Sequence, residues 1–182
     1  LYLGAGLGML VIAPIRRCGK PDRQETRLGR KEWPYTVAMV LLDIAAPVCL
    51  LFGLRTVSAA SASLLNNFEI VATAGIALVF FGEKISGRLW LGIACVTAAC
   101  VVLSLEDVSG LRLSYGALFI LLACVCWGFE NNCTRKISSK DPLQIVLIKG
   151  LFSGLGSVVI GLCTGERVTA VWSVFAALGV GL

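Results

Sequence analysis

The sequence predicts an all-α protein, a polytopic bundle of membrane-spanning helices. Of its 182 residues, 57% are hydrophobic and only 15% are charged, whereas soluble domains contain about 45–50% apolar and about 25% charged residues. Apolar runs long enough to cross a bilayer follow one another along the chain, and they lack the period-two alternation of transmembrane strands. The lipid bilayer is therefore the expected surroundings of this chain.

Seven apolar segments are predicted to span the membrane, because a helix needs about 20 apolar residues, with a range of roughly 17–25, to cross it. The first, at 1–15, and the last, starting near 168, meet the ends of the chain, so we expect a fragment of a longer protein. The gaps after the first one are too short for a soluble domain. The five whole segments are 37–54, 57–81, 87–105, 114–133 and 143–163.

The distribution of Lys and Arg predicts the orientation in a cell membrane. Seven basic residues lie in 16–36, two near 82–88 and three in 134–142, and these alternate gaps face one side. The gaps on the other side hold only Arg55, Arg112 and Arg167. Cytoplasmic loops carry the excess of positive charge, so the 16–36 loop is expected in the cytoplasm. Topology thus explains the net charge of +5, and no nucleic-acid partner is expected.

Composition also limits the chemistry. The sequence contains no histidine, which excludes His-based triads and His metal sites. Its eight cysteines form no CxxC pair and lie mostly in apolar runs, so we interpret them as small core residues. No catalytic residue, cofactor or metal is expected.

Glu69 is the strongest candidate for a functional residue. Thirteen uncharged residues lie on each side of it, which places the carboxylate near the middle of the membrane. Asn66 and Thr73 share its helix face, and Asn67 lies on the adjacent stripe. An ionisable group at this depth costs about 2.5–3.5 kcal/mol and marks a functional site by default. The alternative is a structural hydrogen-bond cluster between helices.

Two further charges lie within predicted spans. Asp43 precedes Pro47 by four residues, and proline frees a backbone carbonyl and tends to kink a helix. Lys149 lies about 9 Å into its span at 1.5 Å per residue. It can extend to the cytoplasmic surface, pair with Asp43 or Glu69, or attract an anionic substrate. Glu130 and Asn131, near the end of their span, are weaker candidates, with interfacial placement favoured.

The stretch Thr56–Ser86 carries a family resemblance. It reads TVSAASASLLNNFEIVATAGIALVFFGEKIS, with a small-residue run, a Leu-Leu pair, Glu69 and then Gly82-Glu83. It resembles the fourth span of EamA-type transporters of the drug/metabolite transporter superfamily. Arg88–Leu105 is similar to the next span, and Tyr115–Lys136 looks like the start of a second repeat. Ile70 stands where the family has a proline, which puts a proline-broken span in doubt.

The resemblance implies ten helices in two five-helix repeats of inverted topology, with substrate between them at mid-depth. Residues 1–106 would end the first repeat, with spans two to five, and 107–182 would begin the second, with spans six to eight. It implies a secondary active transporter of small organic metabolites, such as amino acids, amines or drug-like molecules. Asp43, Asn66, Asn67, Glu69 and Lys149 would line a central cavity, and a buried carboxylate would couple transport to a proton gradient.

Two alternatives stay open from the residues alone. One is a membrane-embedded enzyme, for which Cys49 near Asp43 is the available nucleophile, although a buried thiol is usually inert. The other is a membrane subunit that does not transport. Whether the complete protein forms a homodimer, which substrate it carries and in which direction are left open by the sequence.

Overall fold

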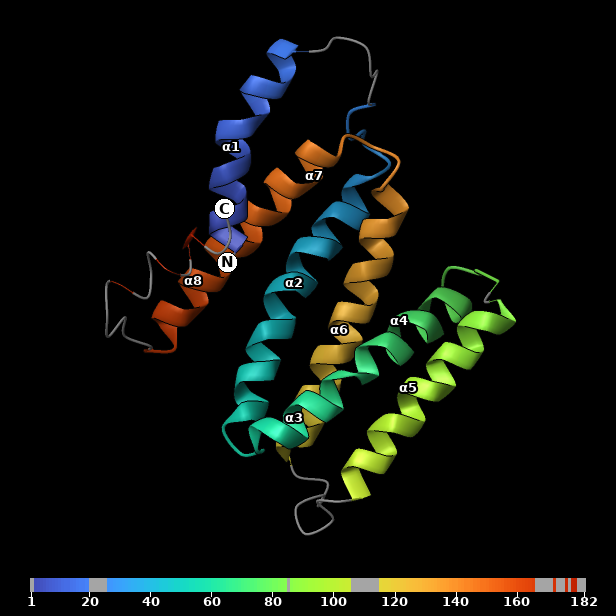
Figure 1. The fold of residues 1–182 in the computed structure, drawn as a ribbon. Helices are drawn as coiled ribbons and strands as arrows, with labels where there is room; N and C mark the ends of the chain where they lie inside the picture. The colour runs from blue at the N-terminus through green and yellow to red at the C-terminus, as the bar shows by residue number, and fades with distance from the viewer. Residues whose placement is uncertain are drawn as a thin grey trace. The chain divides into compact units, whose positions relative to one another are not determined.

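The computed structural model describes residues 2–19, 26–84, 86–105 and 115–165, together with four isolated positions near the C-terminus. These residues form helices joined by turns, with no strand among them (Figure 1). The prediction of an all-helical protein with long apolar helices is therefore confirmed for the described residues. The helices are α1 (Tyr2–Gly19), α2 (Trp33–Leu54), α3 (Ala59–Asn66), α4 (Phe68–Val79), α5 (Gly87–Leu105), α6 (Tyr115–Ile137), α7 (Pro142–Ile148), the π-helix η1 (Lys149–Ser153) and α8 (Gly154–Cys163).

Four helical segments in the described part of the chain are long and apolar enough to cross a membrane. They are Trp33–Leu54, Ala59–Val79, Tyr115–Ile137 and Pro142–Cys163. Each overlaps one predicted span, and α5 begins and ends where its span was predicted. The structure extends the first predicted segment, 1–15, as α1 to Gly19. The predicted span starting near 168 lies almost entirely outside the described residues.

The chain divides into two compact units, and each is described by itself. Unit 1 comprises Leu1–Ile44 and Cys133–Leu182, and unit 2 comprises Ala45–Asn132. The division falls inside α2 and inside α6, so each of these helices contributes to both units. The two sequence repeats, 1–106 and 107–182, are a different division of the chain and stay a prediction.

Unit 1 is held together by close approach of small residues. α1 packs along α7, η1 and α8 (Figure 1). A Cβ atom on Gly150 would lie 2.5 Å from the backbone nitrogen of Gly6, so neither helix has room for a side chain there. Gly154 meets Leu3 of α1 in the same way, and Gly156 meets Ile44 of α2. Small residues at these contacts therefore let the helices approach closely.

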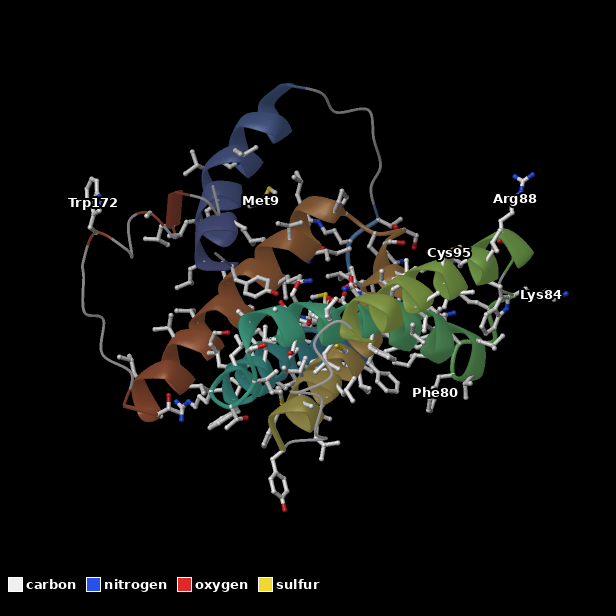
Figure 2. The ribbon with its side chains drawn as sticks, turned by 60° about the horizontal axis from the view of Figure 1, so that its bottom comes forward. Met9, Phe80, Lys84, Arg88, Cys95 and Trp172 are labelled. Atoms are coloured by element: carbon white, nitrogen blue, oxygen red, sulfur yellow. The ribbon has the colours of Figure 1, made fainter. Side chains whose placement is uncertain are left out.

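Unit 2 has a small apolar core between α3 and α6. Ala62, Ile120 and Cys124 are buried there, with Leu50, Val57 and Leu65 packed against them. α5 packs on α3 and α4 (Figure 1). At the end of α4, Gly82 has a φ of +63°, and the Glu83 N–H then donates to the Ala77 carbonyl at 3.0 Å. Lys84 and Arg88 project outward at the turn between α4 and α5 (Figure 2).

Polar contacts join two loops at one end of unit 1. The Lys140 Nζ lies 3.4 Å from Glu32 Oε1. The Leu28 N–H donates to Gln144 Oε1 at 3.1 Å, and the Asp141 N–H donates to the Thr26 carbonyl at 3.2 Å. The described end of the 16–36 loop and the 134–142 loop therefore meet at one end of this unit.

Candidate functional site

The membrane-depth polar residues form two clusters, one in each unit. The charged cluster in unit 1 consists of Tyr2, Asp43 and Lys149. The amide cluster in unit 2 consists of Glu69, Thr73, Asn131 and Asn132. Each brings together helices that are distant in sequence, and neither set of partners was predicted in full.

Asp43 is the centre of the charged cluster. Its side chain is 0% exposed, and its Oδ1 accepts a hydrogen bond of 2.8 Å from the Tyr2 hydroxyl. The Lys149 Nζ lies 3.8 Å from the same oxygen and 6.0 Å from the centroid of the Tyr2 ring. α2 therefore presents the carboxylate, while α1 and η1 present the two groups that face it. Lys149 pairs with Asp43 within unit 1, which was one of the options that its sequence position left open.

Pairing is what makes a charge tolerable at this depth. An unpaired Asp or Lys at the centre of a span costs about 2.5–3.5 kcal/mol, and removing one member of a buried pair typically costs about 3–5 kcal/mol. Lys149 keeps 27% of its side chain exposed, so it is the accessible member of the pair. Pro47 lacks the N–H that would bond the Asp43 carbonyl, yet α2 runs unbroken from Trp33 to Leu54.

The helix that carries Lys149 is locally irregular. Lys149–Ser153 forms a π-helical turn between α7 and α8, and such turns occur often at functional sites. Ser153 is buried at its end. The hydroxyl oxygens of Ser153 and Ser157 are both buried, with no hydrogen-bond partner among the residues that the structure describes.

The amide cluster is neutral apart from one carboxylate. The Asn131 Nδ2 donates to Glu69 Oε1 at 3.0 Å and to Thr73 Oγ1 at 3.4 Å. The Asn132 Nδ2 donates to the backbone carbonyls of Thr73 and Gly128, at 2.9 Å and 2.8 Å. Gly128 permits this contact, because a Cβ there would lie 3.0 Å from the Thr73 backbone nitrogen. Two consecutive asparagines of α6 thus tie it to α4.

The span that carries Glu69 is interrupted although it has no proline. α3 ends at Asn66 and α4 begins at Phe68. The Asn67 side-chain amide donates to the carbonyls of Ser63 and Leu64, at 3.1 Å and 3.4 Å. Asparagine competes in this way with the backbone hydrogen bonds of a helix. The interruption is a single residue: Asn67 keeps right-handed helical angles, with φ of −63° and ψ of −18°, so the turn is tightened without a proline-type break.

The predicted residues of this span have different surroundings. Asn66, Glu69 and Thr73 all contact α6, because the Asn66 Oδ1 accepts from the Cys124 thiol at 3.9 Å and the other two bind Asn131. Asn67 instead turns back to its own helix. Sequence reasoning missed Tyr2, although a tyrosine near the end of an apolar run was a usable signal, and it missed Asn132.

Glu130, for which the sequence favours interfacial placement, is 2% exposed and so is covered by other parts of the protein. α6 continues to Ile137, beyond the predicted end of its span at 133. The depth of Glu130 in the membrane stays a prediction. Among the described residues, no group of three or more His, Cys, Asp or Glu side chains is placed to hold a metal ion.

Known proteins resemble this chain over most of its length. The pattern of the EamA-like transporter family matches residues 2–105. The chain is 25% identical over 171 residues to an uncharacterized transporter of Methanothermobacter thermautotrophicus, covering 87% of this chain and 49% of that protein. It is 30% identical over 104 residues to the uncharacterized inner membrane transporter YedA of Escherichia coli, covering 56% of this chain and 33% of YedA.

A third relative comes from a eukaryote. The chain is 24% identical over 136 residues to an uncharacterized solute carrier family 35 member of Schizosaccharomyces pombe, covering 71% of this chain and 26% of that protein. The chain thus spans about half or less of the length of these relatives. No solved structure is significantly similar to it.

Proposed function

Because this chain belongs to the EamA-like transporter family, we propose that the protein is a secondary active transporter and not an enzyme. It moves small organic metabolites, of amino-acid, amine or drug-like type, across the cell membrane by alternating access. The relatives support membrane transport as the activity, since two of them are named transporters. None of these names specifies a substrate, so the substrate class is part of the proposal.

We propose further that the complete protein has ten helices in two repeats. The family pattern ends at Leu105, next to the boundary at 106 between the end of the first repeat and the start of the second. Five spans per repeat is an odd number, so the second repeat enters the membrane in the opposite direction. The contacts that join the 26–32 and 140–144 segments support a common side for both loops, and their excess of Lys and Arg favours the cytoplasmic side.

The residues proposed to bind substrate or couple transport are those of the predicted set: Asp43, Asn66, Asn67, Glu69, Thr73 and Lys149, with Glu130 and Asn131 as lesser contributors. One observation carries the proposal. Glu69 is the single charged residue between Arg55 and Glu83, and its carboxylate is held by an amide donor from another helix. A carboxylate at this depth can take up and release a proton during each cycle, and this would couple transport to a proton gradient.

Glu69→Gln tests the proposal directly. The amide retains an oxygen that can accept from Asn131 but cannot carry a coupling proton. We expect the full-length protein to keep its thermal stability in detergent and to lose at least about tenfold of its proton-driven flux in proteoliposomes screened with metabolite mixtures.

Glu83→Gln is the matched control, because it makes the same change at the turn beyond α4. It is expected to leave flux unchanged. Equal flux in Glu69→Gln and the wild type would discard the role of Glu69. Binding of metabolites without any flux would instead favour a membrane subunit that does not transport.

A further inference from the structure

Two serines extend the charged cluster along the helix that carries Lys149, and the proposed function does not use them. Ser153 is buried, and the hydroxyl oxygens of Ser153 and Ser157 have no hydrogen-bond partner in the described part of the chain. Native proteins leave few buried polar atoms unsatisfied, and each such atom calls for an explanation. A serine in a helix usually bonds the carbonyl one turn back, but these two do not.

The contacts of neighbouring glycines show which faces of this helix meet α1 and α2, and so on which side the two serines lie. Gly150 and Gly154 meet α1, and Gly156 meets Ile44 of α2. At 3.6 residues per turn, positions 153 and 157 lie between these two contacting faces. α1 and α2 are also the helices that supply Tyr2 and Asp43 to the charged cluster. Positions 153 and 157 therefore lie on the same side of the helix as position 149.

The groups on this side are hydrogen-bond donors around one positive charge. Lys149 and Ser153 are the first and last residues of the π-helical turn, and Ser157 lies four residues further in α8, about 6 Å along the axis. Asp43 is fully buried and its Oδ1 is already bonded by Tyr2. The 3.8 Å between Lys149 Nζ and Asp43 Oδ1 exceeds the roughly 2.7–2.9 Å of a charge-assisted hydrogen bond. Lys149, whose side chain is 27% exposed, thus faces Asp43 Oδ1 at a distance longer than a short charge-assisted bond.

We propose that Lys149 and Ser153 bind the carboxylate group of a small organic acid, with Ser157 further along the same side of the helix, and that Asp43 is the internal counter-ion that holds Lys149 when no acid is bound. This inference rests on the proposed transport function and narrows its substrate class. An ammonium and hydroxyl donors recognise a carboxylate by charge and by hydrogen bonding, whereas an amine would be repelled by Lys149. Asp43 and the acid compete for the same ammonium.

Two matched sets of probes test this site in the full-length protein. Lactate, lactamide and isopropanolamine share one small hydroxylated skeleton but differ in charge, and benzoate, benzamide and benzylamine do so on an aromatic ring. We expect at least one of the two acids to raise the Tm in detergent, and the amides and amines to leave it unchanged. A rise with the amines, or no rise with either acid, would overturn the proposal.

Variants separate binding from a structural role of the ion pair. Ser153→Ala should weaken acid binding about tenfold, because it removes one donor to a charged group, while Ser63→Ala in unit 2 serves as the control. Asp43→Asn should bind the acid more tightly, since the competing carboxylate is gone. The double variant Asp43→Asn with Lys149→Gln removes both charges together, so neither is left unpaired. It should fold but lose the rise in Tm with the acid. An undiminished response in this double variant would contradict the role of Lys149.

Flux in proteoliposomes distinguishes this inference from the proposed function. Flux of other metabolites without any response to the acids would discard the acid site alone. A thermal response to an acid, abolished in the Lys149 variants but without flux of any compound, would support the site and count against transport.

Discussion

The two polar clusters solve the same physical problem in different ways. The charged cluster of unit 1 balances a buried Asp43 with the ammonium of Lys149 and the hydroxyl of Tyr2. In the amide cluster of unit 2, the Asn131 amide donates to Glu69 and to the Thr73 hydroxyl, and no cation is among the contacts described above. The charged cluster contains two opposite charges within apolar helices, and the amide cluster contains one charge.

This difference predicts different sensitivities. An ion pair couples two residues tightly, because loss of one partner leaves the other charge uncompensated. Hydrogen bonds between helices in a membrane are weaker, about 0.6 kcal/mol on average and up to about 1.7 kcal/mol. Unit 1 should therefore depend on its cluster for stability far more than unit 2 does.

The largest effect is expected from Lys149→Met. It leaves Asp43 buried without its cation, so the free energy of unfolding should fall by about 3–5 kcal/mol. Asp43→Asn should cost less, because Lys149 is 27% exposed and the amide oxygen of the substituted side chain would still accept from Tyr2. Thermal unfolding in detergent measures both variants. Equal losses of unfolding free energy in the two variants would contradict the expectation that an unpaired Asp43 is costlier than an unpaired Lys149.

The next effect concerns the glycine contact beside the charged cluster. Gly150→Ala places a Cβ against the backbone of α1, and overpacking of this kind costs about 1–3 kcal/mol. Gly161→Ala is the control in α8, where a Cβ would meet nothing within 4 Å, and its better helix propensity favours the variant by up to about 1 kcal/mol. Opposite shifts in the melting temperature are expected. A stabilised Gly150→Ala variant would show that α1 can move away from η1.

A smaller effect is expected from Asn131→Ala in unit 2. It removes the donors to Glu69 and Thr73, so the unfolding free energy should fall by about 1 kcal/mol. Proton-driven flux should fall more than stability does, since Glu69 loses its positioning partner. A loss of unfolding free energy as large as that of Lys149→Met would contradict the difference expected between the two clusters.

The smallest effect lies outside the spans, at Glu32. Desolvation alone would raise the pKa of its carboxyl group, but the hydrogen bond from the Gly29 N–H and the neighbouring Lys140 ammonium outweigh it and lower the pKa. The folded-state pKa then lies below the unfolded one, so this contribution is complete at neutral pH and is lost as the pH falls through the acidic range of both values. Glu32→Gln should remove that part of the acid dependence of the melting temperature, and an unaltered acid profile would argue against it.

Most of the helix pattern followed from local sequence. The lengths of the apolar runs predicted α2, α5 and the spans that contain α4, α6 and α8, because crossing a bilayer demands a minimum number of apolar residues whatever surrounds them. Asp43, Glu69 and Lys149 were equally visible, since a charge inside such a run is costly. The irregular turn at Asn67 was less visible, because the span has no proline and Asn67 was interpreted as a binding residue.

What the sequence by itself determined was therefore which segments enter the membrane and which charges go with them, as both depend on residues close together in the chain. Tertiary structure alone decided the partners. Lys149 had several options and pairs with Asp43, more than a hundred residues away, while Tyr2 and Asn131 became hydrogen-bond donors only once their helices packed. The physical reason is that burial forces a polar group to find some partner, but only the packing of distant helices selects which one.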